Sequence, residues 1–429
     1  MLDNKGRNDV QRLKILTAIA TMMVASPVLA QEITVWDVNV DDAAHATYYD
    51  HAKAAFEAAH PGATLNLLSQ PDAEYYTLLG TALASKAGPD VIWANGGAQA
   101  KALVGGLIPL DDKLPELVSK LVGKSAFTGP DGKLYFIPTT LQGHVVYYNK
   151  ALYKAAGLDP EKPPTSWAEL SKVCDAFKAQ GKPACFMMAN KEGYNAEFFL
   201  SEAANQSLTA KQQADWLAGK LHWSDPPIKA ILQAWVDTAK NGWYQEGGNS
   251  QTMFMDEFAL FEQGVGANVM GLLSNVAHWK QFETNMGVDK VGVYPMPSPT
   301  VAADQHEGAP GVPLDGGVGY GVNKDSANID LAVDAVRILA SPEVLSYLVN
   351  DTGSVPANTE VNTSGIDSPG LKQIMGWLAT RAVPTTHANS SAAELDEWHH
   401  QSQLLFNGET TVDQAAAALD KVQAEAKPQ

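Results

Sequence analysis

Polar side chains follow three predicted strands near the N-terminus, where they could hydrogen-bond to a ligand. The strands are expected at residues 33–36, 63–68 and 90–93, with helices at 43–59 and 73–85. This alternation predicts a parallel sheet with helices on both faces, and ligands of such sheets bind beyond the carboxyl ends of the strands. The candidate ligand-binding residues at that edge are Asp37, Asn39, Asp41, Gln70, Tyr75 and Asn95. The alternative interpretation is that these segments are polar loops that cap the next helix.

Acidic residues that could catalyse a reaction are present, but they stand in no recognisable catalytic motif. The pairs Asp41-Asp42 and Asp256-Glu257 could serve a glycosidase, which needs two carboxylates at a defined separation. The chain contains no G-x-S-x-G, HExxH or P-loop sequence, and His399-His400 lacks the spacing of metal ligands. We therefore predict a binding protein that is not an enzyme and holds no metal or cofactor. An exported carbohydrate-active enzyme is the alternative.

Residues 1–30 have the features of a secretory signal peptide. Four basic residues precede an apolar run at 15–24, and small residues at 28–30 form a cleavage site. The apolar run is too short to span a bilayer comfortably. No cysteine follows the cleavage site, so we expect a soluble periplasmic protein without a lipid anchor. A buried N-terminal helix is the alternative interpretation of this segment.

The charge of the chain after residue 30 limits its partners. Residues 1–30 hold four of the 30 lysines and arginines and two of the 48 acidic residues, which leaves 26 basic and 46 acidic residues and a formal charge of −20. Nucleic acid and anionic membranes need a basic patch and are disfavoured. The only arginines left are Arg337 and Arg381, which favours a neutral, hydroxyl-rich ligand because arginine is the preferred partner of carboxylate, sulfonate and phosphate. Anions held by backbone amides at helix starts, and cationic solutes such as polyamines, stay open.

The two cysteines, Cys174 and Cys185, flank a predicted helix end at Gly181. In an oxidising compartment such a pair predicts a disulfide that closes a short loop. The alternative, a metal-binding or redox-active pair, lacks the CxxC spacing and a nearby histidine.

The segment from residue 138 to 170 carries the most specific signal in the chain. A strand at 145–148 ends in Asn149-Lys150, a short helix and three prolines follow, and Ser166 and Glu169 form a capping box for the next helix. This segment resembles the crossover of bacterial extracellular solute-binding proteins of family 1, the sugar receptors of ABC importers, in which a strand reading YYNK leaves the first lobe. Further segments match that family in the same order along residues 31–425: residues 261–270, 291–297, 316–324 and 353–356.

The resemblance implies an α/β fold of the type II periplasmic binding protein kind. Two lobes, each a mainly parallel sheet flanked by helices, would be hinged by crossover strands and would clamp the ligand in the cleft between them. With 429 residues and 45% hydrophobic composition, the chain is long enough for two cores. We place the crossings near Leu141, Val291 and Pro342. The expected parts are therefore lobe N at 31–141 and 292–342, and lobe C at 142–291 and 343–429.

The resemblance also implies a function and further site residues. The protein would be the monomeric substrate-binding component of an ABC importer that delivers a mono- or oligosaccharide to the membrane permease. Sugars need aromatic rings against their C–H faces and polar groups against their hydroxyls. The crossover, the ends of later strands and the C-terminal helices supply the further candidates, which are Gln142, His144, Glu192, Tyr194, Asn195, Ser274, Asn275, Trp279, Gly317, Tyr320 and Trp398. Of the aromatic residues, Trp279 is the preferred candidate for packing against the sugar, and a structural role is the alternative for His144.

Overall fold

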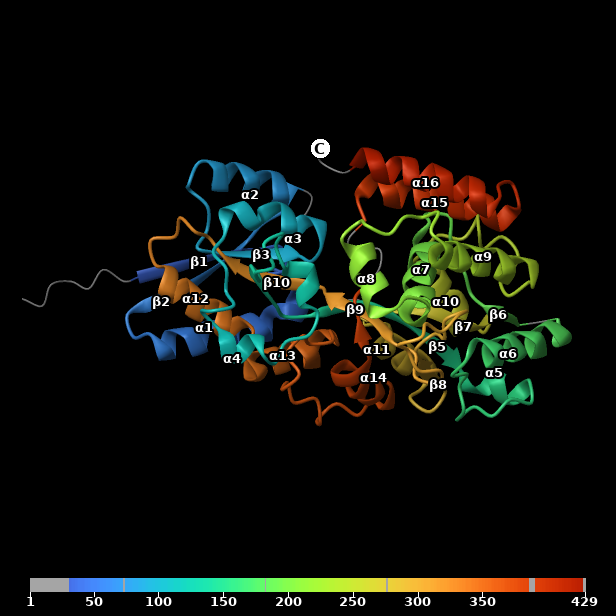
Figure 1. The fold of residues 1–429 in the computed structure, drawn as a ribbon. Coiled ribbons are helices and arrows are strands. Elements are labelled where there is room, and N and C mark those ends of the chain that lie inside the picture. The colour runs from blue at the N-terminus through green and yellow to red at the C-terminus, as the bar shows by residue number, and fades with distance from the viewer. Residues whose placement is uncertain (1–30, 72–73, 182, 275–276, 386–389, 427–429) are drawn as a thin grey trace, which may run out of the picture.

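The structure is a computed structural model that describes residues 31–426 except 72–73, 182, 275–276 and 386–389. The predicted signal peptide and Asn275 lie outside the described residues. In the described part, two α/β lobes lie side by side, each built on its own sheet (Figure 1). The predicted two-lobed α/β fold is confirmed.

The sheet of the first lobe has the strand order β2-β1-β3-β10-β4. Its strands are β1 (Gln31–Asp37), β2 (Ala63–Ser69), β3 (Val91–Asn95), β4 (Phe136–Pro138) and β10 (Val318–Val322). β1 pairs in parallel with β2 and β3, as the sequence predicts, whereas β10 runs antiparallel to β3 and β4. From Ile33 on, every second residue of β1 is buried, so Ile33, Val35 and Asp37 all face the core.

Helices from the N-terminal part of the chain and from residues 329–352 cover this first sheet (Figure 1). α1 packs against α12 and α13 and buries Tyr48, Tyr49, Ala52 and Phe56. The α-helices of this lobe are α1 (Ala46–Ala59), α2 (Tyr75–Ala84), α3 (Ala98–Leu103), α4 (Pro115–Val118), α12 (Ile329–Leu339) and α13 (Pro342–Thr352). Its 3-10 helices are η1 (Ala43–His45), η3 (Val104–Gly106) and η4 (Lys124–Phe127).

The sheet of the second lobe is organised around β5, its longest strand. The order is β11-β9-β5-β7-β6, and β8 also pairs with β5. The strands are β5 (Leu141–Asn149), β6 (Ala184–Phe186), β7 (Gly266–Leu272), β8 (Val291–Tyr294), β9 (Val312–Gly316) and β11 (Ala382–Val383). β5 is antiparallel to β7, β8 and β9, and only the pairs β6–β7 and β9–β11 are parallel. The expectation of a mainly parallel sheet is therefore wrong here, because β5 runs away from the first lobe as the chain enters this sheet and β9 runs toward it as the chain leaves.

The second lobe is rich in helices, as predicted. Its helices are α5 (Lys150–Ala155), α6 (Trp167–Gln180), α7 (Tyr194–Ser207), α8 (Ala210–Leu217), α9 (Pro226–Lys240), α10 (Asp256–Glu262), α11 (His278–Met286), α14 (Pro369–Arg381), α15 (Ala392–Asn407) and α16 (Val412–Ala426). The Ser166 side chain caps α6 by accepting from the Glu169 amide, but the Glu169 carboxylate accepts from Thr165, one residue earlier than the capping box predicts.

The chain passes between the sheets at 138–141, at 316–318 and after α13. β8 and β9 both pair with β5, so the second lobe extends to Gly316 and does not end at Val291. α13 packs against α1, so the first lobe extends past Pro342. These are corrections to the expected lobe boundaries. The Val291 strand belongs to the second lobe because its apolar residues pair with the exposed edge of β5.

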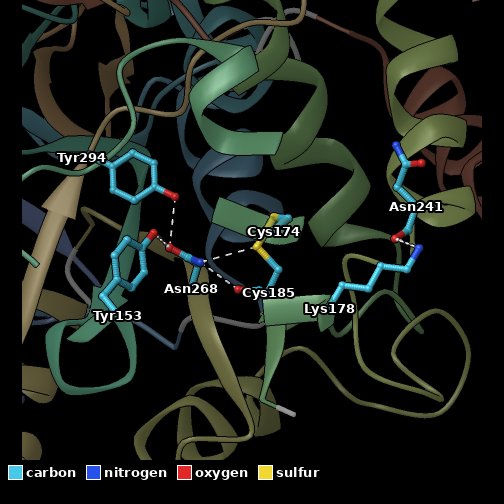
Figure 2. Close-up of a disulfide and its surroundings, with 7 residues drawn as sticks. All are labelled: Tyr153, Cys174, Lys178, Cys185, Asn241, Asn268 and Tyr294. Atoms are coloured by element: carbon cyan, nitrogen blue, oxygen red, sulfur yellow. Dashed lines mark hydrogen bonds between the residues drawn. A yellow bond between two sulfur atoms is a disulfide. The ribbon is translucent and has the colours of Figure 1, made fainter. Parts of the chain in front are cut away.

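A disulfide joins Cys174 on α6 to Cys185 on β6, which confirms the predicted pairing. Beside it, the Asn268 side chain donates to the Cys185 carbonyl (2.7 Å) and accepts from the hydroxyls of Tyr153 (2.7 Å) and Tyr294 (3.0 Å) (Figure 2). This buried amide connects β7 to the disulfide and to two tyrosines of the lobe core.

We predict that the double substitution Cys174→Ser and Cys185→Ser lowers the free energy of unfolding by about 3 kcal/mol, because the disulfide restricts a short loop in the unfolded chain. Denaturant unfolding measures the change. Reducing agent should destabilise the native protein by a similar amount and leave the double variant unaffected. Equal stability of the oxidised and reduced native protein would contradict the prediction.

Candidate functional site

A cavity of about 280 Å³ lies where the two lobes meet. The first lobe contributes the loop after β1, one face of α1, the end of β3 and the start of β10, and the second lobe contributes the start of β5 and the residue after Leu273. The lining residues are Val38, Asn39, His45, Tyr48, Tyr49, Trp93, Asn95, Thr139, Thr140, Leu141, Gln142, Ser274, Gly317, Val318, Tyr320, Leu348 and Ser354. Among the described residues, the lining holds no lysine, arginine, aspartate or glutamate.

Two strand crossings form the floor of the cavity. The Gly317 amide donates to the Thr140 carbonyl (2.8 Å), and the Thr139 amide donates to the Val318 carbonyl (2.9 Å). A Cβ at Gly317 would lie 2.9 Å from the Thr140 hydroxyl oxygen, so a side chain would not fit without a shift. The glycine therefore lets the two crossing segments approach closely enough to close the floor.

Three tyrosines and an asparagine are held by hydrogen bonds around the first-lobe half of the cavity. Tyr48 donates to the Leu339 carbonyl (2.9 Å), and Tyr49 (2.8 Å) and Tyr320 donate to the Asp37 carboxylate. Asn95 donates to the Tyr76 hydroxyl from its backbone (3.0 Å) and side-chain (3.3 Å) nitrogens. These partners fix the side chains before any ligand arrives, which reduces the entropy cost of binding.

Tyr48, Tyr49 and Tyr320 form the first-lobe wall of the cavity. Asp37 lies behind this wall and does not line the cavity. It is fully buried, and burial raises the pKa of its carboxyl above the usual range, while the hydrogen bonds from Tyr320, the Asn39 amide and Tyr49 act in the opposite direction. The alternation of β1 explains the position, because Asp37 shares the buried face of Ile33 and Val35.

The second lobe presents an apolar patch at the same edge as Ser274. β6 and β7 are parallel, so the segments that follow them lie at one edge of the sheet. Tyr194, in the segment after β6, is 41% exposed, and Met253 and Met255, in the loop before α10, are 39% and 60% exposed. The Tyr194 ring packs against Phe254 with ring centres 5.3 Å apart. We call Tyr194, Met253 and Met255 the second-lobe patch.

The structure brings six predicted site residues together in the cavity lining, and these are Asn39, Asn95, Gln142, Ser274, Gly317 and Tyr320. Three others lie at the surface or partly exposed, outside the lining: Asp41, Gln70 and Glu192. The Gln70 amide donates to the Asp37 carbonyl (3.0 Å), and the Glu192 carboxylate accepts from the Phe254 amide (2.9 Å). Glu192 thereby holds the loop that carries the second-lobe patch.

Five further candidates are buried side chains of the lobe cores. Tyr75 donates to the Trp93 carbonyl (2.7 Å), His144 stacks on Phe198 (4.0 Å between ring centres), and Trp398 stacks on Trp223 (5.7 Å). The Asn195 side chain accepts from the Ala189 amide and donates to Glu257. Trp279 is 4% exposed, and its indole nitrogen donates to the Gly353 carbonyl (2.8 Å).

Several lining residues were not predicted from the sequence, and these are His45, Tyr48, Tyr49, Thr139, Thr140 and Ser354. Tyr48-Tyr49 belongs to a helix, whereas in this part of the first lobe the prediction considered only residues that follow strands. Thr139-Thr140 directly precedes the predicted crossover, and this position could have identified both residues as candidates for the lining. His45 lies beside Asp42, with Nδ1 and Oδ2 3.1 Å apart.

Neither a metal site nor a membrane-spanning helix is found in the described residues. No group of three or more histidine, cysteine or acidic side chains is arranged to hold a metal ion there. No helix in that part of the chain is long and apolar enough to cross a bilayer.

Two α/β lobes around an interlobe cavity define a two-lobed binding protein. Residues 51–373 match the family profile described as bacterial extracellular solute-binding protein. The chain therefore belongs to the bacterial extracellular solute-binding protein family, and the resemblance inferred from its crossover motifs is confirmed.

Relatives of known name match different shares of the chain. The sn-glycerol-3-phosphate-binding periplasmic protein UgpB of Agrobacterium fabrum is 25% identical over 389 residues, which cover 86% of this chain and 79% of the relative. The protein of the same name from Brucella abortus is 32% identical over 128 residues, and this chain spans only 29% of its length.

Solved structures share the whole fold. A chitin oligosaccharide binding protein aligns with a TM-score of 0.71 and 23% identity over 92% of this chain and 99% of its own. A cyclic alpha-maltosyl-1,6-maltose binding protein from Arthrobacter globiformis aligns with a TM-score of 0.71 and 22% identity over 92% and 98%. At these identities the similarity establishes the fold.

We predict that Trp279→Ala lowers the free energy of unfolding by about 3–5 kcal/mol, because the indole is buried and bonded to Gly353. Trp279→Phe, which keeps most of the ring volume, should cost less. Denaturant unfolding of both variants measures the difference. Unchanged stability together with lost ligand affinity would instead make Trp279 a ligand contact.

Proposed function

We propose that this protein is the substrate-binding component of an ABC importer and captures a sugar or glycoside between its lobes. The observation that supports this most directly is the lining of the interlobe cavity by hydroxyl, amide and aromatic side chains. Among the described residues, none of the lining residues is a lysine, arginine, aspartate or glutamate. Such a lining suits a neutral molecule with many hydroxyl groups, since each hydroxyl both donates and accepts.

The ligand contacts we propose come from both lobes. Asn39, Asn95, Gln142 and Ser274 would bond to hydroxyls, and Tyr320 with Gly317 would form the wall and floor. Trp93, which is 4% exposed at the cavity, would offer the edge of an aromatic ring. The second-lobe patch would complete the site when hinge bending at the strand crossings closes the lobes. This closure would hold the apolar face of a sugar against Tyr194.

The names of the relatives favour a second candidate ligand, glycerol phosphate. Proteins called sn-glycerol-3-phosphate-binding match this chain at 25–32% identity. Among the described lining residues, however, only His45 can become positively charged, and phosphate is usually held by arginine, lysine or several backbone amides. The chemistry of the cavity therefore supports the neutral ligand more strongly.

The proposed cellular role follows from the family and the predicted signal peptide. The protein would act in the periplasm as a monomer, deliver its ligand to the permease subunits in the inner membrane, and release it unchanged. A cytoplasmic ATPase would power the transport. No nucleic-acid partner is proposed, because the chain is strongly acidic.

A melting-temperature screen tests the ligand class. The purified protein is heated with galactose, maltotriose, diacetylchitobiose, sn-glycerol 3-phosphate and spermidine. A ligand at about 100 times its dissociation constant adds roughly 2.7 kcal/mol of stability, which such a screen detects. We expect a shift with a neutral sugar and recovery of that sugar unchanged. A shift only with the phosphate or the polyamine would contradict the proposed ligand, and turnover would indicate an enzyme.

We predict that Gln142→Ala weakens binding of the neutral ligand at least tenfold, about 1.4 kcal/mol, because Gln142 is an exposed amide in the cavity lining. Titration calorimetry measures the affinity. Gln99, also an exposed glutamine but on α3 outside the lining, is the control, and Gln99→Ala should bind normally. Equal affinities of the two variants would remove Gln142 from the site.

A further inference from the structure

A buried carboxylate lies directly behind the cavity wall. Asp37 has no exposed surface, but three lining residues donate to it. Asn39 donates to Oδ1 from its backbone (2.8 Å) and side-chain (3.2 Å) nitrogens, and Tyr49 and Tyr320 donate their hydroxyl protons to Oδ2. The carboxylate is therefore one side chain away from whatever occupies the cavity.

Asp37 accepts four hydrogen bonds, which stabilise its ionised form. They act against burial, which raises the pKa of this carboxyl group. No ion pair among the described residues includes Asp37. His45 acts on it electrostatically, but that ring is paired with Asp42. The charge is thus balanced mainly by hydrogen bonds from the wall.

These bonds determine which hydrogen-bond donors and acceptors the wall can present to a ligand. Tyr49 and Tyr320 have given their only hydroxyl protons to Asp37, so their oxygens have only lone pairs left for another partner. Asn39 uses one of its two side-chain N–H groups for Asp37, so its side-chain oxygen is still an acceptor and its second N–H is still a donor. A sugar hydroxyl can donate to these oxygens. A phosphate or carboxylate oxygen cannot, and the charge of Asp37 repels it.

From this geometry, and resting on the function proposed above, we propose that Asp37 is a positioning residue that sets the ligand specificity of the cavity. It orients the hydroxyl oxygens of Tyr49 and Tyr320 as hydrogen-bond acceptors and so selects ligands that present hydroxyl donors and rejects anionic ones. It does so without touching the ligand.

The test is Asp37→Asn, which keeps the size of the side chain and removes its charge. Affinities for galactose, maltotriose and diacetylchitobiose as neutral probes, and for galactose 6-phosphate and sn-glycerol 3-phosphate as anionic probes, are measured by calorimetry. The ratio of neutral to anionic affinity is the readout, because general damage to the fold weakens both classes alike. Asp90→Asn is the matched control. Asp90 accepts hydrogen bonds from Thr34 and Ser326 and directly precedes β3, so it lies at the end of that strand away from the cavity.

The native protein should bind a neutral probe at least tenfold more tightly than either anion. Asp37→Asn should reduce that ratio at least tenfold, whereas Asp90→Asn should leave it unchanged. Tyr320→Phe keeps the carboxylate and should still reject anions, which tests the proposal even if Asp37→Asn does not fold. An unchanged ratio in Asp37→Asn, or anion binding by Tyr320→Phe, would overturn the role of Asp37 alone. A native protein that binds no neutral probe would overturn the proposed function as well.

Discussion

The pairing of two crossing segments, residues 138–143 and 314–318, is the constraint on which the rest of the structure depends. Leu141–Gly143 at the start of β5 pairs with Leu314–Gly316 at the end of β9 in the second-lobe sheet, and the adjoining strands β4 and β10 pair in the first-lobe sheet. The Asp315 carboxylate fastens the crossing to the first lobe by accepting from the Ala126 amide and the Ser125 hydroxyl. The third connection, after α13, runs beside them, since the Leu141 amide donates to the Val355 carbonyl. The connections between the lobes therefore lie together, and the cavity lies on them.

This location explains why the cavity can act as a binding site. Its floor is the crossing itself, so bending there changes the distance between the first-lobe wall and the second-lobe patch directly. The wall is rigid because Tyr48, Tyr49 and Tyr320 already have hydrogen-bond partners behind it. We propose that bending at the crossing brings the second-lobe patch toward this rigid wall, as in a receptor that closes on its ligand.

The sequence predicts the local structure well and the burial of single side chains poorly. The strands β1, β2 and β3 and the Ser166 cap of α6 follow from alternation and a capping residue. The burial of the Asp37 side chain could also be predicted, since Asp37 continues the alternation of buried residues that includes Ile33 and Val35. The burial of Trp279 and Trp398 depends on Gly353 and Trp223, which are distant in sequence. No local pattern contains such partners, so both residues resemble exposed aromatic contacts.

The most direct test of this account is a crystal structure of the protein with the neutral sugar that stabilises it most. We predict closed lobes, with the sugar between the tyrosine wall and the second-lobe patch and its hydroxyls bonded to Asn39 and Gln142. A sugar bound away from the strand crossing, or a closed complex whose ligand is an anion held against Tyr49 and Tyr320, would contradict the account.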